Sequence, residues 1–431
     1  MHHIHRQKLI NTLSEHKNGV VYIQGGTILS RYQTDYEYPF RQESNFLYLS
    51  GVQEPDFQLV IHLETGEYHL FAPKRDTQYA VWNGFIYSNE DYINRYKPDH
   101  LHYDENLQDV LKKINPDMVY CLNTSQAEAL RKSGFKTDDN LLNDALAYCR
   151  IIKTEWELDQ LRTASKVASQ AHAEILKGLK PGMMEYEVKA LYEYAATSQG
   201  LTHHPYNGIY ATGENSAVLH YVGSKRELKD GDYFLIDAGA ECNGYAADIT
   251  RTHPVSGSFS PVQRDLYHIT LRAQNNALTN IKPGVKMEDL HLNTCRDILA
   301  GLTDMGLVKG NADELMDNNI FSLFFPHGLG HLMGLDTHDV GGYPKGVKKI
   351  DRPGVKFLRA RITLEPGMVI TIEPGLYIIP ALLIPAFENP DQAKYLNISR
   401  LKELLDLGGV RIEDNVIITE DGKENMTAVP K

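Results

Sequence analysis

The dipeptide Asn243-Gly244 constrains the fold of this chain more than any other feature, because it separates two runs of strand-forming residues. Both of its residues tolerate the positive φ angles of a two-residue hairpin turn. The sequence therefore predicts strands over residues 233–237 and 245–252, joined by a tight turn. If that turn sets the register, Cys242 opposes Tyr245 and every later pair follows from this one.

The predicted register brings two acidic residues together. Asp237 opposes Thr250 and Gly239 opposes Asp248, so the alternation of side chains puts Asp237, Asp248 and Thr250 on one face. Diagonal neighbours in a sheet lie about 7–8 Å apart at Cα, so both carboxylates can reach a common ion. The alternative is that both face solvent, as Asp usually does. Asp237 ends an apolar run, however, where burying an unpaired acid is costly, and this favours a functional pair.

A second group of candidate ligands lies in residues 325–338, where His327, His331 and His338 fall close together. Three glycines in the same segment disfavour a helix and predict a loop packed against its surroundings. Any one of these histidines could have a structural role. Three together favour a metal or acid–base site.

Two further acids follow strand-like runs. Glu373 comes directly after residues 368–372 and is followed by Pro-Gly, so its carboxylate is expected where a strand breaks off. Arg411 and Glu413 lie in residues 410–418, which reads as one strand with both side chains on the same face. An exposed Arg–Glu ion pair is the alternative here.

Taken together, Asp237, Asp248, His331, Glu373 and Glu413 supply four carboxylates and one imidazole. An oxygen-rich set without thiolates suits Mn²⁺, Co²⁺ or Zn²⁺ and disfavours a structural zinc site. Four negative charges match two divalent ions. Such a dinuclear centre activates water for attack on a carbonyl group, so hydrolysis is the expected reaction.

The chain of 431 residues reads as an α/β (α+β) protein of two domains. Short apolar runs separated by polar turns predict an N-terminal α/β domain over residues 1–153. Thr154 and Glu157 form a capping-box pattern that starts a long helix, so a second domain is predicted over residues 154–431.

A weak repeat runs through the second part. Leu179-Lys-Pro-Gly182 is echoed by Ile281-Lys-Pro-Gly284, and residues 231–239 are echoed by residues 367–375. Chance, or the ordinary grammar of strands and turns, is the alternative explanation. If real, the repeat predicts two related halves that each contribute an acidic strand end to one site.

Charge and composition exclude several classes of protein. With 44 Lys+Arg against 56 Asp+Glu the net charge is −12, which disfavours nucleic-acid binding. Four widely spaced cysteines indicate a reducing compartment. The N-terminus lacks a signal-peptide core, and the longest apolar stretch, residues 376–387, is too short for a membrane helix. We therefore expect a cytoplasmic protein without membrane contact.

The five candidate ligands, in the segments HGLGH, IEPG and GGVRIEDN among others, resemble those of the dinuclear metallopeptidase family that includes methionine aminopeptidase, aminopeptidase P and prolidase. The resemblance covers residues 154–431 and implies a pita-bread catalytic domain with pseudo-two-fold halves. Residues 40–51 resemble the N-terminal domain found in aminopeptidase P and prolidase.

Within this family the segments around residues 327–344, 357–359 and 401–413 look most like the prolidase branch, which splits Xaa-Pro dipeptides. Removal of the first residue ahead of proline in longer peptides, as in aminopeptidase P, is the alternative. A non-catalytic binding protein on the same fold is a more distant one.

The resemblance also implies roles for individual residues. Two divalent ions, most often Mn²⁺ with Co²⁺ or Zn²⁺ as alternatives, would hold a hydroxide that attacks the Xaa-Pro carbonyl. Glu373 would act as general base or proton shuttle, and His327 and His338 would support the intermediate and the substrate. His220 and Arg359 would contact the proline carboxylate. Arg411 would support the ligands, and Tyr206 and Thr250 would lie near the metals. Prolidases are typically homodimers, and Trp82 matches a position where the partner's N-terminal domain can cap the site.

Overall fold

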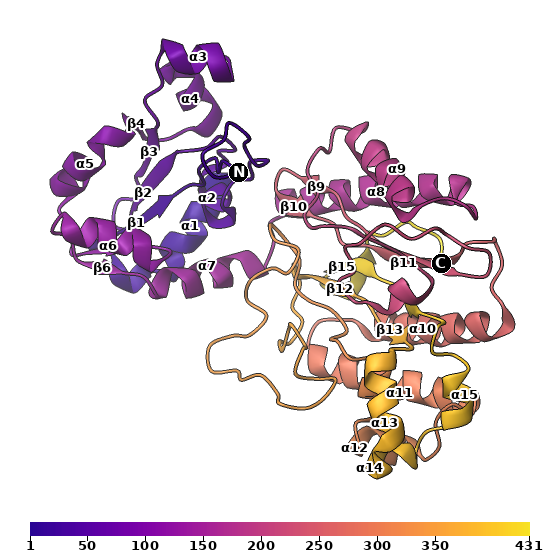
Figure 1. The fold of residues 1–431 in the computed structure, drawn as a ribbon. Coiled ribbons are helices and arrows are strands. Elements are labelled where there is room, and N and C mark those ends of the chain that lie inside the picture. Colours follow the sequence, from indigo (N-terminus) through magenta and orange to yellow (C-terminus); the bar gives the residue numbers. More distant parts are fainter. The chain divides into compact units, whose positions relative to one another are not determined.

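The computed structural model describes residues 1–431, which form two compact units, Met1–Arg150 and Ile151–Lys431 (Figure 1). Each unit has its own hydrophobic core. No helix combines the length and the apolar character that crossing a lipid bilayer requires.

The first unit is built on a mixed six-stranded sheet with the strand order β4-β3-β2-β1-β5-β6. The short apolar runs of the predicted N-terminal domain, residues 20–23, 59–63, 68–71 and 118–121, fall on strands of this sheet, where aliphatic and aromatic residues pack well. The elements are β1 (Gly19–Gln24), β2 (Gln58–His62), β3 (Tyr68–Ala72), β4 (His100–Tyr103), β5 (Met118–Tyr120), β6 (Thr137–Asp138), α1 (His2–Thr12), α2 (Ser44–Ser50), α3 (Thr77–Asn83), α4 (Asn89–Tyr96), α5 (Leu107–Ile114), α6 (Thr124–Lys132) and α7 (Leu141–Ile151), with single 3₁₀ turns η1 (Ser14–His16) and η2 (Asp104–Asn106).

The second unit begins with the predicted capping box, in which Thr154 and Glu157 satisfy each other's backbone N–H groups. Two helix pairs, α8–α9 and α10–α11, accompany two small three-stranded sheets, β11-β8-β7 and β12-β15-β16. The strands β9 and β10, and likewise β13 and β14, form two-stranded ribbons. The elements are α8 (Glu155–Gly178), α9 (Glu185–Thr197), β7 (Ile209–Thr212), η3 (Gly213–Ala217), β8 (Tyr233–Asp237), β9 (Glu241–Cys242), β10 (Tyr245–Ala246), β11 (Thr250–Pro254), α10 (Pro261–Asn280), α11 (Met287–Asp304), α12 (Ala312–Asp317), η4 (Ile320–Leu323), β12 (Val369–Ile372), β13 (Gly375–Tyr377), α13 (Pro380–Glu388), α14 (Pro390–Ala393), α15 (Ile398–Lys402), β14 (Gly409–Arg411), β15 (Asp414–Ile418) and β16 (Lys423–Asn425).

The internal repeat is confirmed by matching backbone hydrogen bonds. The Gly182 N–H donates to the Leu228 carbonyl at 2.9 Å, and the Gly284 N–H donates to the Leu364 carbonyl at 2.8 Å. Each Lys-Pro-Gly turn thus joins a helix pair, α8–α9 or α10–α11, to the segment that leads into β8 or β12. The two halves of this unit therefore share one plan.

The hairpin register is also confirmed, since Tyr245 pairs with Cys242 and Thr250 pairs with Asp237. The predicted continuous strand over 245–252 is wrong, because residues 247–249 belong to neither β10 nor β11. At this break the Asp248 N–H donates to the side chain of Asn415 instead of to a strand neighbour.

The prediction of one strand over residues 410–418 is wrong as well. β14 pairs with β13, whereas β15 pairs with β12, and Glu413 lies between the two strands. The Glu413 N–H donates to the Thr250 carbonyl at 3.0 Å, so the chain changes partner at this residue.

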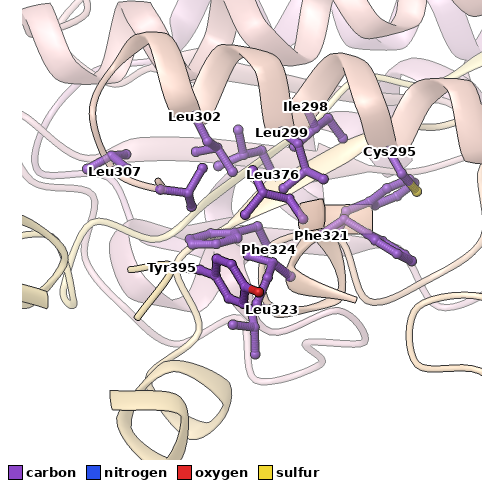
Figure 2. Packing of buried hydrophobic residues seen from close by; sticks show 14 of the residues in the cluster. Cys295, Ile298, Leu299, Leu302, Leu307, Phe321, Leu323, Phe324, Leu376 and Tyr395 are labelled. Carbon is purple, nitrogen blue, oxygen red and sulfur yellow. The ribbon is translucent and has the colours of Figure 1, made fainter. Parts of the chain in front are cut away.

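The largest core of this unit lies beneath α11. Figure 2 shows Cys295, Ile298, Leu299 and Leu302 of α11 packed with aromatic side chains that include Phe324. Two other apolar clusters fill the halves, one under α8 and α9 and one between α10, α11 and β12. These cores hold the strand ends in place where the acidic residues project.

Candidate metal centre

Four of the five predicted ligands lie where a strand ends or breaks. Asp237 is the last residue of β8, Asp248 lies in the break before β11, Glu373 follows β12, and Glu413 separates β14 from β15. His331 lies in the predicted loop, next to an isolated bridge between Leu332 and Ile370. At these positions the side chains leave the sheet and converge on one cavity.

His331 is oriented as a metal-binding imidazole. Its Nδ1 lies 3.0 Å from the Leu332 carbonyl, to which it can only donate, so the lone pair resides on Nε2. Nε2 lies 3.4 Å from Asp248, 3.8 Å from Glu373 and 4.0 Å from Glu413. Ligands held about 2.1 Å from one ion lie roughly 3–3.5 Å from each other, so this spacing is close to that of a coordination sphere.

The donor atoms fall into overlapping groups that suit two ions. Donors of Asp237, Asp248 and Glu413 lie within 4.8 Å of one another, and so do donors of His331, Glu373 and Glu413. Glu413 belongs to both groups. One oxygen of Asp237, Oδ1, is buried and has no hydrogen-bond partner in the chain. The donor chemistry and this unsatisfied oxygen both fit divalent cations.

Burial perturbs the acids strongly. It raises the pKa of Asp237 to about 6, although Arg411 opposes the shift, and it raises the pKa of Glu373 to about 7, opposed by His331. Burial and Asp248 raise the pKa of Glu413. For Asp248, burial is outweighed by the neighbouring His331, and its pKa is lowered. Four carboxylates in one buried cluster are costly unless cations compensate them.

Arg411 is the buried cation behind the ligands, so the exposed ion pair considered for it is wrong. Its side chain donates to Asp237 at 2.6 Å and to the hydroxyl of Tyr377 at 2.9 Å. That hydroxyl lies 2.8 Å from His327 Nε2, while His327 Nδ1 lies 2.8 Å from the Gly328 carbonyl. Because Nδ1 must donate to the carbonyl, Nε2 accepts from Tyr377, and both nitrogens of His327 are engaged.

Two residues of this network were not predicted. Tyr377 stands two positions after Gly375 in an apolar run, where it reads as an ordinary core aromatic. Asn415 accepts from the Asp248 N–H at 2.9 Å and donates to the Asp248 carbonyl. The only sequence signal for Asn415 is its place two residues after Glu413, at the start of an apolar run.

Thr250 and Tyr206 lie beside the candidate ligands. The Thr250 hydroxyl donates to Glu413 at 2.6 Å and Thr250 is fully buried. Tyr206 lies close to Asp237 and Asp248, and burial together with these carboxylates raises the pKa of its hydroxyl.

The five candidate ligands line a cavity of about 310 Å³. His220, His338, Phe357 and Arg359 line its outer part, and the His338 ring meets the His331 ring edge-on at 4.4 Å. No acidic side chain of the chain forms an ion pair with Arg359, so this cation is free to meet an anionic ligand. Trp82 lies on α3 of the first unit with 79% of its surface exposed, and its contact with a partner stays a prediction.

Two protein families match the chain. Residues 159–420 match metallopeptidase family M24, and residues 2–120 match the aminopeptidase P N-terminal domain.

Curated relatives span almost the whole chain. It is 39% identical to Xaa-Pro dipeptidase of Rattus norvegicus, covering 99% of this chain and 91% of that protein, and 38% identical to Xaa-Pro dipeptidase of Homo sapiens, covering 99% and 90%. It is 36% identical to a probable Xaa-Pro aminopeptidase of Paracoccidioides brasiliensis, covering 98% and 92%.

Solved structures show the same fold. Zinc-substituted aminopeptidase P of E. coli in complex with product matches with a TM-score of 0.84 and 32% identity, over 99% of this chain and 94% of that one. The predicted α/β architecture with a pita-bread catalytic unit is thereby confirmed. The chain therefore belongs to metallopeptidase family M24, as a metal-dependent peptidase whose catalytic domain follows an N-terminal domain of the aminopeptidase P type.

Proposed function

We propose that this enzyme hydrolyses Xaa-Pro dipeptides with two divalent ions, Mn²⁺ first among them, held by Asp237, Asp248, His331, Glu373 and Glu413. The observation that carries the proposal is the convergence of these donors in two groups that share Glu413. Co²⁺ and Zn²⁺ accept the same donors and are the alternative ions.

When bound, the two ions would lower the pKa of a water molecule and polarise the peptide carbonyl. Glu373 borders the cavity and can take a proton from the attacking water and pass it to the leaving nitrogen. Arg411 donates to the Asp237 carboxylate and opposes the rise in its pKa that burial causes. His338 lines the cavity beside His331 and would contact the substrate.

The dipeptide preference rests on the outer part of the cavity. Arg359 is an unpaired guanidinium there and His220 lines the same cavity, so together they can bind a free carboxylate next to the scissile bond. A longer peptide presents an uncharged amide at this position. The names of the rat and human relatives agree with this preference.

The second candidate is removal of the residue ahead of proline in longer peptides, which the structural match to aminopeptidase P supports. Hydrolysis of Gly-Pro and Gly-Pro-Leu by the Mn²⁺-loaded enzyme separates the two. We expect a kcat/KM at least about tenfold higher for the dipeptide, since the unpaired guanidinium would be left without its anion in the tripeptide complex. Faster cleavage of the tripeptide would assign the aminopeptidase activity instead.

The ligand set is tested with Asp237→Asn, which keeps the size of the side chain but removes its charge. We expect loss of bound metal and a fall in kcat of at least about 10³-fold with an unchanged circular dichroism spectrum. Asp304→Asn, at an exposed acid of the same unit, is the matched control and should behave as the wild type. Full metal content and turnover in Asp237→Asn would refute the ligand assignment. Bound metal without turnover in the wild type would favour the alternative of a non-catalytic binding protein.

We also propose a homodimer in which Trp82 caps the partner's site. The exposure of this aromatic side chain supports the proposal. Light scattering should give twice the chain mass, and Trp82→Ala should raise KM for dipeptides. A monodisperse monomer with full activity would exclude the arrangement.

A further inference from the structure

A cluster of histidines lies on one face of the sheet of the first unit. In the parallel pairing of β3 and β4, His69 stands beside His100 and Phe71 stands beside His102. The His69 ring stacks on that of His100 with 4.6 Å between centroids and on that of His102 at 5.3 Å. Alternating positions on neighbouring strands therefore bring three imidazoles together at the edge of the sheet.

A carboxylate completes the cluster. Glu67, directly before β3, places one oxygen 3.5 Å from His100 Nε2, and its other oxygen accepts from the Thr65 hydroxyl at 3.1 Å. One donor atom each of Glu67, His69 and His100 lie within 4.8 Å of one another. Glu67 and His100 have side chains 48% and 47% exposed, so an ion can reach them from solvent.

His69 lacks a partner for one ring nitrogen. The residue is only 7% exposed, and its Nδ1 lies 3.1 Å from His102 Nε2. Its Nε2 is buried without any hydrogen-bond partner, a state that costs free energy in a folded protein. If Nδ1 donates to His102, the Nε2 lone pair is free, and His102 orients the ring as outer partners of metal-binding histidines do.

The charge of the cluster favours a cation over an anion. Burial and the neighbouring imidazoles lower the pKa of His69 to about 4, and burial also lowers the pKa of His102. His69 is therefore neutral at pH 7, and hydrogen bonds from His100 and Thr65 lower the pKa of Glu67, which keeps it negatively charged. The donor set of two imidazoles and one carboxylate is one that divalent transition metals prefer.

We propose that Glu67, His69 and His100 bind a divalent transition-metal ion of the Zn²⁺ type, with water in its remaining positions. This site belongs to the first unit and is independent of the proposed peptidase activity. Bound metal would link the residue before β3 to β4, which is an edge strand held by only one neighbour. Its expected effect is on the stability of this unit.

The test uses the full chain and Zn²⁺ itself. After dialysis against micromolar Zn²⁺, metal analysis should show one ion fewer per chain in His100→Gln and in Glu67→Gln than in the wild type. Because both side chains are half exposed, the variants should fold, which circular dichroism checks. Zn²⁺ should raise the thermal midpoint more in the wild type than in either variant, while turnover of Gly-Pro stays within about twofold.

His3→Gln is the matched control, since His3 is an exposed histidine in another segment of the same unit. It should keep the wild-type Zn²⁺ content. Equal Zn²⁺ content in the wild type, His100→Gln and Glu67→Gln would overturn the proposal. Loss of the ion in His3→Gln alone would assign it to the N-terminal histidines and would overturn the proposal as well. The readout is a difference between variants, so it does not depend on how many ions the M24 centre holds.

Discussion

At the residue scale, the hydroxyl of Tyr377 joins the guanidinium of Arg411 to the imidazole of His327 beside the candidate metal centre. It accepts from Arg411 and donates to His327, while Arg411 holds Asp237 at the same time. Tyr377 is fully buried, so water cannot replace a lost hydrogen bond. The position of Asp237, a proposed ligand, thus depends on a residue outside the proposed ligand set.

Tyr377→Phe should lower kcat/KM for Gly-Pro about 10–100-fold, the range seen when outer partners of metal ligands are removed. The physical reason is that Arg411 and His327 each lose a hydrogen-bond partner, while the ring still fills the core. Steady-state kinetics at fixed Mn²⁺ measures the effect. Tyr395→Phe is the control, because its hydroxyl contacts Glu314 outside the cavity. Unchanged kinetics in Tyr377→Phe would show that the link has no functional role.

At the scale of the element, the repeat explains why acids occur at matching places. Asp237 follows Gly231 by six residues and Glu373 follows Gly367 by six residues. Asp237 is the last residue of β8, the central strand of its sheet, and Glu373 directly follows β12, an edge strand of the other sheet. The hairpin register was predictable because a turn and a period of two determine it locally. The breaks at Asp248 and Glu413 were not, since they depend on the distant partners Asn415 and Thr250.

Contact between β12 and the loop of residues 325–338, which holds His331, depends on Gly330. A Cβ atom at this position would lie 1.9 Å from the Thr371 carbonyl oxygen, so the loop could not stay where it is. We expect Gly330→Ala to cost about 3 kcal/mol of unfolding free energy and to displace His331 from Glu373, with strongly weakened metal binding. Denaturant unfolding and metal titration measure both effects.

Gly178→Ala is the matched control for that substitution, because nothing lies within 4 Å of a Cβ atom at Gly178 in α8. It should be neutral or slightly stabilising. A Gly330→Ala enzyme with normal metal affinity would mean that the loop adjusts without moving His331.

At the scale of the whole molecule, folding buries histidines whose protonation by acid disfavours the folded state. In the second unit His172 lies on α8 and His291 on α11, and both are fully buried. Burial lowers the pKa of His172 to about 3 and that of His291 to about 4. Each is neutral in the folded chain, whereas in the unfolded chain a histidine titrates near pH 6.5.

Acid should therefore destabilise the fold over a defined window. Since the unfolded chain binds more protons, the stabilisation is complete above pH 6.5 and is lost as the pH falls toward 4. For His291 the loss at pH 4 is about 3 kcal/mol. In His291→Gln the thermal midpoint should fall less steeply between pH 6.5 and 4. His268→Gln, at an exposed position of α10, should keep the wild-type slope, and equal slopes in all three proteins would contradict the assignment.

The sequence by itself determined the features that depend on neighbours along the chain: the hairpin turn, the capping box, the acids at strand ends and the repeat. These follow from local geometry, in which each residue constrains only the next few. The tertiary structure alone decided which side chains support the ligands, because Tyr377, Asn415 and the break at Glu413 depend on contacts between segments more than 30 residues apart. It also decided that His69, Glu67 and His100 meet, since sheet pairing and not sequence proximity brings β4 beside β3.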